Sequence, residues 1–266
     1  MTSAHPAILS DEVLSSVAAE FDTPVLVAQL DAPLHSYALL RHHLPRVTPL
    51  YAMKSLPFPP LLRALVAQGA GFDVATLGEI DMLRAASPQL NSNFNPSLYI
   101  IHSHPVKKES EIAGAIRRGV TTFVVDCVGE LQKMVRFARR SSVMLRIAFA
   151  SDTAMCNLSG KFGCPFAEAR DLLHLARDIG VNIVGIAFHT GSQAESGRDT
   201  AAAIAAVAPL FEEFAELTTL DIGGGFPLDY AGGATAARAN LDLALSALEH
   251  GSPPGPPHLY PRGGGG

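Results

Sequence analysis

The sequence has no tryptophan and only three cysteines among its 266 residues, Cys127, Cys156 and Cys164. No two of them have the CxxC spacing, so we expect neither a disulfide framework nor a zinc ribbon. This cysteine usage fits a reducing, cytoplasmic compartment. Charged residues are also scarce, at 17%, and the formal net charge of -5 argues against nucleic acid or an anionic membrane as a partner.

A long hydrophobic run is missing as well. The most apolar long stretch, residues 201–211, is too short to span a bilayer, and the first residues lack the basic and apolar regions of a secretory signal. We therefore expect no membrane partner. Hydrophobic residues nevertheless make up 48% of the chain, which is enough to bury a large core.

Short apolar runs alternate with segments of helical period, which is the pattern of a parallel sheet built from βαβ units. The pattern predicts strands at residues 25–30, 49–53, 71–75, 98–101, 122–126, 143–149, 183–188 and 220–222. It predicts helices at residues 59–68, 77–86, 108–117, 130–139 and 168–178. About eight strands in roughly 250 residues predict an α/β fold of the (β/α)8 TIM-barrel type. A doubly wound open sheet is the alternative.

Composition divides the chain into three parts. Residues 1–24 form an N-terminal segment, and residues 25–250 contain the predicted barrel. In the tail, residues 251–266, eleven of sixteen residues are Gly or Pro, so we expect irregular structure there. The tail is either a linker or the product of a shifted reading frame.

Most of the predicted strands end in a polar or charged residue after an apolar run. In a (β/α)8 barrel the active site is assembled at the carboxyl ends of the strands, so these residues are the first candidates for chemistry. They are Lys54, Asp73, Asp126, Arg146, His189 and Asp221.

Lys54 lies in the segment YAMKS and ends an apolar strand. At a barrel mouth, partial burial would lower the pKa of its amine and make the neutral form a nucleophile that can form a Schiff base with a carbonyl group. The alternative is an ordinary lysine at a strand end, with its amine in water.

Two turns that follow strands are candidates for binding a phosphate. In DIGGGFP three glycines, Gly223 to Gly225, let the backbone approach a ligand closely. In FHTGSQ, His189 could stack on a planar ligand and Ser192 could donate to a phosphate oxygen. The alternatives are a tight strand-to-helix turn and a histidine satisfied by a backbone carbonyl.

His102 and His104 end another strand two residues apart and could hold a metal ion, as in barrel hydrolases. This hypothesis would need His189 and Asp221 as further ligands. It gives the glycine run after Asp221 no role, so we expect no metal site.

Taken together, these segments resemble the fold type III pyridoxal-phosphate decarboxylases that act on ornithine, diaminopimelate or arginine. The resemblance rests on YAMKS, GAGFDVATLGEI, LSGKFG, FHTGSQ and DIGGGFP in this order, and on the stretch at residues 100–131, which is closest to ornithine decarboxylase. It covers residues 23–227 and implies a barrel of the alanine racemase-like type.

The resemblance also implies a role for each matching residue. Lys54 would carry the cofactor, pyridoxal 5'-phosphate, and His189 would stack on its ring and act with Lys54 in catalysis. Asp73 and Arg146 would line the cofactor site, with Glu79 as a weaker candidate. The cofactor phosphate would lie against Ser192, Gly224 and Gly225.

The implied reaction is decarboxylation of a basic amino acid, ornithine or lysine, by a cytoplasmic homodimer of polyamine biosynthesis. Members of this family carry a β-rich domain after the barrel, whereas only 39 residues follow Pro227 here. We therefore expect the C-terminal β-domain to be missing and the activity of this chain to be in question. Diaminopimelate or arginine decarboxylation, a non-catalytic regulator and a barrel-only cofactor-binding protein are the alternatives.

Overall fold

The computed structural model of the protein describes residues 9–87, 98–149, 154–156, 160–194 and 197–225. The predicted tail at residues 251–266 and the part of the predicted barrel after residue 225 lie outside the described residues.

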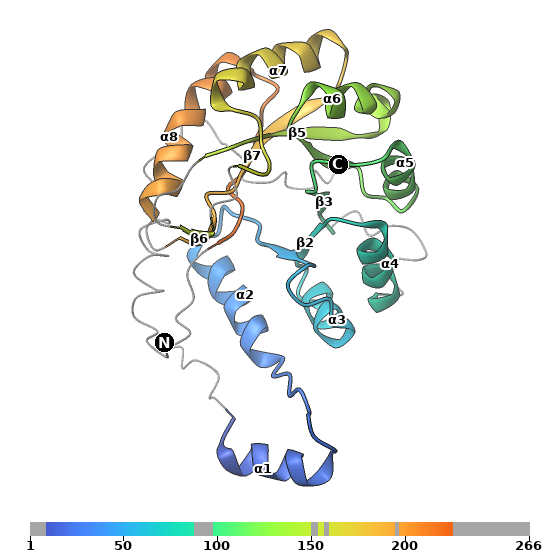
Figure 1. Ribbon diagram of the computed structural model, residues 1–266, viewed down its shortest axis with the longest axis vertical. Coiled ribbons are helices and arrows are strands. Elements are labelled where there is room, and N and C mark those ends of the chain that lie inside the picture. Colours follow the sequence, from blue (N-terminus) through green and yellow to red (C-terminus); the bar gives the residue numbers. More distant parts are fainter. Residues whose placement is uncertain (1–8, 88–97, 150–153, 157–159, 195–196, 226–266) are drawn as a thin grey trace.

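Seven parallel strands form one curled sheet, which is the centre of the fold (Figure 1). In chain order, which is also their order in the sheet, they are β1 (Leu50–Ala52), β2 (Gly71–Val74), β3 (Ile100–His102), β4 (Thr122–Val125), β5 (Ser142–Ile147), β7 (Ile183–Phe188) and β9 (Thr219–Asp221). A doubly wound sheet reverses its strand order partway, so this unbroken order excludes that alternative. The sheet is a half-barrel, as the barrel prediction requires. The remaining strands, β6 (Ala154–Cys156) and β8 (Ser192–Ala194), form a separate antiparallel pair.

Helices follow the strands and cover the outer face of the sheet (Figure 1). Those at predicted positions are α3 (Pro59–Ala67), α4 (Leu77–Ala86), α5 (Glu109–Arg117), α6 (Val128–Met134) with the 3-10 helix η2 (Val135–Arg140), and α7 (Phe166–Asp178). Three further helices were not predicted: α1 (Asp11–Glu20), α2 (Asp31–His43) and α8 (Gly197–Glu213). In the part of the chain that the structure describes, no helix has both the length and the apolar character of a membrane span.

Local sequence explains why the first helices after the sheet strands begin where they do. Helix α3 starts with proline, whose fixed φ suits the first helical turn, and it buries Leu61, Leu62 and Leu65. Helix α4 starts with a capping box, in which the Thr76 hydroxyl accepts from Glu79 N at 3.2 Å. The Glu79 carboxylate in turn accepts from Thr76 N at 3.1 Å. Both helices are thereby fixed close to the strand ends that carry the polar residues.

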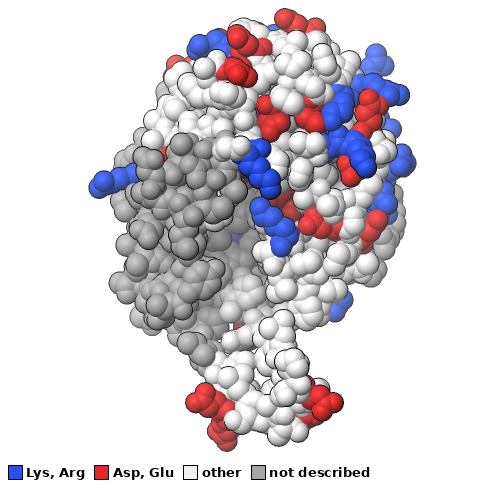
Figure 2. All heavy atoms as spheres, viewed as in Figure 1, with Lys and Arg blue, Asp and Glu red and all other residues white. Residues whose placement is uncertain are grey.

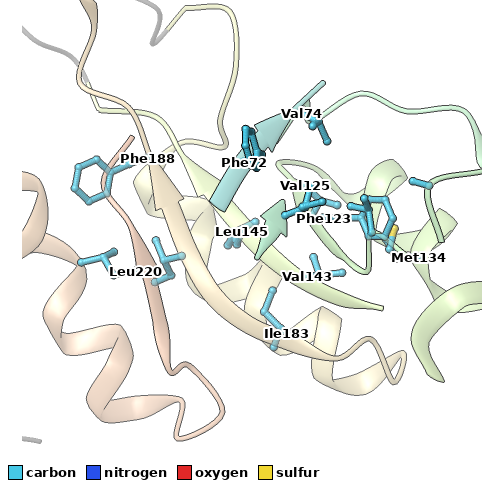
Figure 3. Packing of buried hydrophobic residues seen from close by; sticks show 14 of the residues in the cluster. Phe72, Val74, Phe123, Val125, Met134, Val143, Leu145, Ile183, Phe188 and Leu220 are labelled. Atoms are coloured by element: carbon cyan, nitrogen blue, oxygen red, sulfur yellow. The ribbon is translucent and has the colours of Figure 1, made fainter. Parts of the chain in front are cut away.

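The main hydrophobic core lies between the sheet and the helices (Figure 3). Alternate strand residues face it, because successive side chains of a strand point to opposite sides. They include Phe72, Val74, Phe123, Val125, Val143, Leu145, Ile183, Phe188 and Leu220. A second, small cluster of Val124, Met144 and Ala187 lies on the opposite, inner face of the sheet. The register pairs Val124 with Met144. The inner face therefore carries a small apolar cluster next to the strand ends.

The prediction of a strand at residues 25–30 is wrong. The segment is not part of either sheet, and Leu26 is 88% exposed. A strand needs a neighbour to take its backbone hydrogen bonds, and none of the described strands pairs with this segment. Its apolar residues alone therefore do not make it a strand.

Charged side chains of both signs lie over the upper and right-hand part of the face in Figure 2, where Figure 1 shows α5, α6 and α7. Arg118 of the α5 C-terminus pairs with Asp81 of α4 through both carboxylate oxygens, at 2.6 and 2.9 Å. Arg136 of η2 pairs with Glu109 of α5. These exposed pairs join neighbouring helices and contribute little stability each.

Candidate active site

The register of the sheet brings the predicted polar residues to one end of its inner face. Ala52 of β1 lies beside Asp73 of β2, and Arg146 of β5 lies beside Ala187 of β7, which in turn lies beside Asp221 of β9. Asp73, Arg146 and Asp221 therefore belong to the same face as the small cluster of Val124, Met144 and Ala187.

Lys54 is held at the strand ends by its neighbours in the chain. Met53 is fully buried, and its backbone N–H donates to Asp73 O at 2.9 Å, while the Ser55 hydroxyl donates to Ala52 O at 2.7 Å. The Lys54 side chain itself is exposed, so the predicted partial burial is wrong. The backbone of Lys54 is therefore held in place by its neighbours, and its exposed side chain can reach over the end of the sheet.

Asp73 is the most perturbed carboxyl group of the site. Burial, with smaller effects of the like charges on Asp221 and Glu79, raises the pKa of Asp73 to about 7. A hydrogen bond from Ser103 and the charge of Lys54 oppose this shift. Among the described residues, Asp73 Oδ1 is buried with no hydrogen-bond partner. Near neutral pH, Asp73 can therefore hold or release a proton beside Lys54.

His189 is neutral in this environment. Burial first, and then the positive charges of Arg146 and Lys54, lower the pKa of His189 to about 4. Gly191 N donates to His189 Nδ1 at 3.3 Å, which assigns the ring proton to Nε2. A neutral, half-buried imidazole of fixed tautomer presents a flat surface without a net charge.

Arg146, on β5, is a second cation that acts on His189. Burial lowers the pKa of Arg146, and three carboxylates oppose the shift, in the order Asp126, Asp221 and Asp73. The guanidinium carbon lies 5.3 Å from the centre of the Phe162 ring. Lys54, Asp73, Arg146 and His189 are thus electrostatically coupled to one another, as expected for one site.

The two glycine-containing turns pack against each other. A Cβ at Gly225 would overlap Gly191 O and lie 3.0 Å from His189 Cε1, and Gly225 has a φ of +91°. A Cβ at Gly224 would meet nothing within 4 Å. Ser192 opens strand β8 with an exposed side chain. Gly225 is therefore required by the contact with the His189 turn, whereas Gly224 has an open side on which a ligand could lie.

Other residues have roles that the sequence did not reveal. Glu79, the weaker candidate, caps α4 and also accepts from Ala75 N at 2.5 Å, so its contacts are structural. Ser103 and Phe162 contact the site but were not predicted. Ser103 follows β3 directly, so its position at a strand end could have indicated it if hydroxyl groups had been counted with the charged residues.

Two of the residues that the metal-site alternative needs, His102 and Asp221, lie on opposite faces of the sheet. His102 pairs in register with Val74 and Phe123, so it faces the helices, and its ring lies 5.8 Å from that of Phe123. Asp221 faces the inner side, so the two cannot share an ion. Within the described ranges, no group of three or more His, Cys, Asp or Glu residues could hold a metal.

Comparisons with known proteins agree with this arrangement. The family model for the pyridoxal binding domain of pyridoxal-dependent decarboxylases matches residues 34–251. The lysine/ornithine decarboxylase of Selenomonas ruminantium is 38% identical over 240 residues, which are 89% of this chain and 58% of the relative. Antizyme inhibitor 2 of Xenopus laevis is 32% identical, over 82% of this chain and 48% of its own length. The chain thus spans about half the length of these relatives.

Solved structures extend the likeness to three dimensions. The lysine/ornithine decarboxylase of Vibrio vulnificus in complex with putrescine matches with a TM-score of 0.80 and 30% identity, over 93% of this chain and 66% of that one. A variant of SrLDC in complex with PLP matches with a TM-score of 0.82 and 36% identity, over 91% and 63%. The predicted barrel fold is confirmed by these matches together with the curled sheet.

Proposed function

The chain belongs to the pyridoxal-dependent decarboxylases, and from this premise we propose that Lys54, Asp73, Arg146 and His189 form the cofactor site of an enzyme that decarboxylates a basic amino acid. Lysine or ornithine is the first candidate substrate. The observation that carries the proposal is geometric: the sheet register places Asp73 and Arg146 at the same end of one face, and Gly225 packs against His189 there.

The residues present fit pyridoxal phosphate, the cofactor of this family. An aldehyde needs an amine, which Lys54 supplies from an exposed position. A flat aromatic ring needs an uncharged surface, which the neutral His189 imidazole supplies. A phosphate needs close backbone approach, and the open side of Gly224 beside the tightly packed Gly225 allows it. Asp73 Oδ1, buried and without a partner among the described residues, is available to a polar group of the ligand.

When bound, pyridoxal phosphate supplies an electron sink for the bonding pair left as the substrate carboxyl group departs as carbon dioxide. Lys54 would hold the cofactor through its side-chain amine. Asp73, with its pKa raised to about 7 by burial, can take up or release a proton at its carboxyl group near neutral pH. The cation of Arg146 disfavours a second positive charge nearby.

His189 orients the reacting group instead of moving a proton to it. Its pKa of about 4 keeps the ring neutral across the physiological range. The bond from Gly191 N fixes the ring orientation, and Gly225 packs against its Cε1 edge. A fixed, uncharged surface of this kind would orient a flat ring bound against it.

The charge balance of the site supports a basic substrate. Asp126 and Asp221 act on Arg146 at the strand ends, and acidic residues there would attract an amino acid with a cationic side chain. The similarity to lysine/ornithine decarboxylases supports lysine or ornithine. Diaminopimelate and arginine are the nearest alternatives. A cytoplasmic homodimer that acts in polyamine biosynthesis is part of the same proposal.

A non-catalytic regulator is the second candidate function, favoured by the similarity to antizyme inhibitor 2. A barrel-only cofactor carrier is the third. Both differ from the first in one measurable property, the release of carbon dioxide.

The experiment is a pyridoxal phosphate titration of the 266-residue chain, followed by absorbance, and then carbon dioxide release from lysine, ornithine, diaminopimelate and arginine. Lys54→Ala should abolish the covalent cofactor signal, whereas Lys108→Ala, an exposed lysine before α5, should leave it unchanged. Binding with decarboxylation supports the enzyme. Binding without it supports a carrier or a regulator. A covalent signal that persists in Lys54→Ala, or a parent chain that binds no pyridoxal phosphate, contradicts the proposed site.

A further inference from the structure

The aromatic ring of Phe162 lies at the centre of a small cluster beside the site. The guanidinium carbon of Arg146 lies 5.3 Å from the centre of this ring, and the His104 ring meets it edge-on at 5.4 Å. The ammonium nitrogen of the exposed Lys161 lies 5.0 Å from the same centre. A cation over an aromatic face is attracted by the ring electrons, more strongly when it is partly removed from water. The half-buried Arg146 meets that condition.

Asp126 connects the same turn to Arg146 from another side. It follows β4, the neighbour of β5 that carries Arg146, and its Oδ2 accepts from Gly163 N at 3.0 Å. Among the carboxylates that act on Arg146, Asp126 has the largest effect. One carboxylate therefore both holds the turn that carries Phe162 and attracts the guanidinium.

The backbone fixes this turn to the strand of Arg146. Cys164 N donates to Arg146 O, and Ala148 N donates to Cys164 O, both at 2.9 Å. Gly163 has a φ of +97°, and a Cβ there would lie 2.6 Å from Ala148 N. Phe162 thus stands at a fixed place relative to Arg146, set by the strand itself.

Arg146 has two other carboxylates within electrostatic reach, Asp221 and Asp73. If its guanidinium moved to Asp73, it would occupy the carboxyl oxygen that now has no partner among the described residues. A device that holds Arg146 on the β4–β5 side therefore keeps Asp73 available.

We propose that Asp126 and Phe162 are positioning residues that clamp the Arg146 guanidinium on the β4–β5 side of the site. The consequence for cofactor binding rests on the proposed function. The clamp itself concerns only side chains of this chain and can be tested without cofactor.

The test uses Phe162→Leu, which removes the ring, and Asp126→Asn, which keeps an acceptor for Gly163 N–H and removes the charge. Phe162→Tyr keeps the ring and serves as the conservative rescue. Matched controls are Phe21→Leu, at the half-exposed end of α1, and Asp178→Asn, at the exposed end of α7. The two test variants remove different parts of the clamp, so a folding failure of one leaves the other as the test.

The first readout is made without cofactor, by NMR of the Arg146 Nε–H group and of the Asp73 carboxyl titration. We expect Phe162→Leu and Asp126→Asn to shift the Arg146 signal and speed its exchange. We also expect them to lower the titration midpoint of Asp73, as the cation moves toward it. Lys54, Asp221, Glu79 and Ser103 also face Asp73 and are unchanged in both variants. Phe162→Tyr and the two controls should match the parent chain.

The second readout is the dissociation constant of pyridoxal phosphate, which we expect to rise roughly threefold to thirtyfold in the two test variants. An unchanged Arg146 signal and Asp73 midpoint in both variants would overturn the clamp. A parent chain that binds no pyridoxal phosphate would instead refute the proposed function and leave the first readout to decide on the clamp.

Discussion

The two faces of the sheet differ although the same strands build both. The outer face carries large apolar side chains that are fully buried against the helices, such as Phe72 and Phe123. The inner face has only a small apolar cluster, and charged residues, among them Asp73 and Arg146, lie at one end of it. Stability therefore resides mainly in one face, and the candidate chemistry lies at the end of the other.

The largest expected effect comes from removing a large side chain of the outer face. Phe123→Ala should destabilise the fold by about 3–5 kcal/mol, because the ring is fully buried and leaves a cavity. Chemical denaturation followed by circular dichroism measures the change. Equal sensitivity of the inner-face variant Val124→Ala, which removes fewer atoms from a small cluster, would break the comparison between the faces.

The two glycines at the end of the inner face, Gly224 and Gly225, differ in how closely other atoms pack against them. Gly225→Ala should cost about 1–3 kcal/mol, because the residue has positive φ and its Cβ would overlap Gly191 O. Gly224→Ala should change stability by less than about 0.5 kcal/mol, because its side is open. Thermal unfolding of both variants without cofactor measures the difference. Similar melting temperatures of the two variants would contradict the close packing of the Gly225 turn against the His189 turn.

The buried carboxyl group of Asp73, on the inner face, makes the stability of the fold depend on pH. The folded pKa of Asp73, about 7, lies above its ordinary value of 3.8, so its contribution to stability falls as pH rises from about 4 to 7. Asp73→Asn should therefore melt higher than the parent chain at pH 8, on the order of 5 °C, and this gain should shrink toward pH 4. His189 changes stability in the opposite sense over about pH 4 to 6.5, but equally in both chains. A gain independent of pH would show that Asp73 titrates normally.

The smallest effect is expected in the segment outside both faces. Leu26→Ser should change the free energy of unfolding by no more than about 0.5 kcal/mol, because Leu26 is 88% exposed. Denaturation under the conditions used for Phe123→Ala measures it. A loss above about 2 kcal/mol would mean that residues 25–30 are covered in solution.

Periodicity predicted the sheet because a buried parallel strand has a distinctive apolar run. Seven of the eight predicted strands form, and the exception, residues 25–30, has the composition of a strand without a neighbour to pair with. Helix α8 was missed because its alanine-rich sequence was interpreted only as an apolar run. Strand pairing is a property of the whole sheet, so a local pattern cannot decide it.

The candidate site could be predicted to a similar extent. Strand ends identified Lys54, Asp73, Arg146 and His189, because barrel topology brings such ends together. Phe162 could not be found this way, since its contact with Arg146 depends on how a turn folds back onto β5. The exposure of Lys54 was mispredicted for a related reason: burial at a strand end depends on the loops around it.

The most direct test of the account is to locate the cofactor on the chain. The protein is incubated with pyridoxal phosphate, reduced with borohydride, digested and analysed by mass spectrometry. We expect the label on Lys54, with occupancy lowered by Gly225→Ala, by Phe162→Leu and by Gly224→Ala, the last because its methyl group would take the open side on which the phosphate would lie. Label spread over exposed lysines such as Lys108, with Lys54 unmodified, would contradict the site at the strand ends.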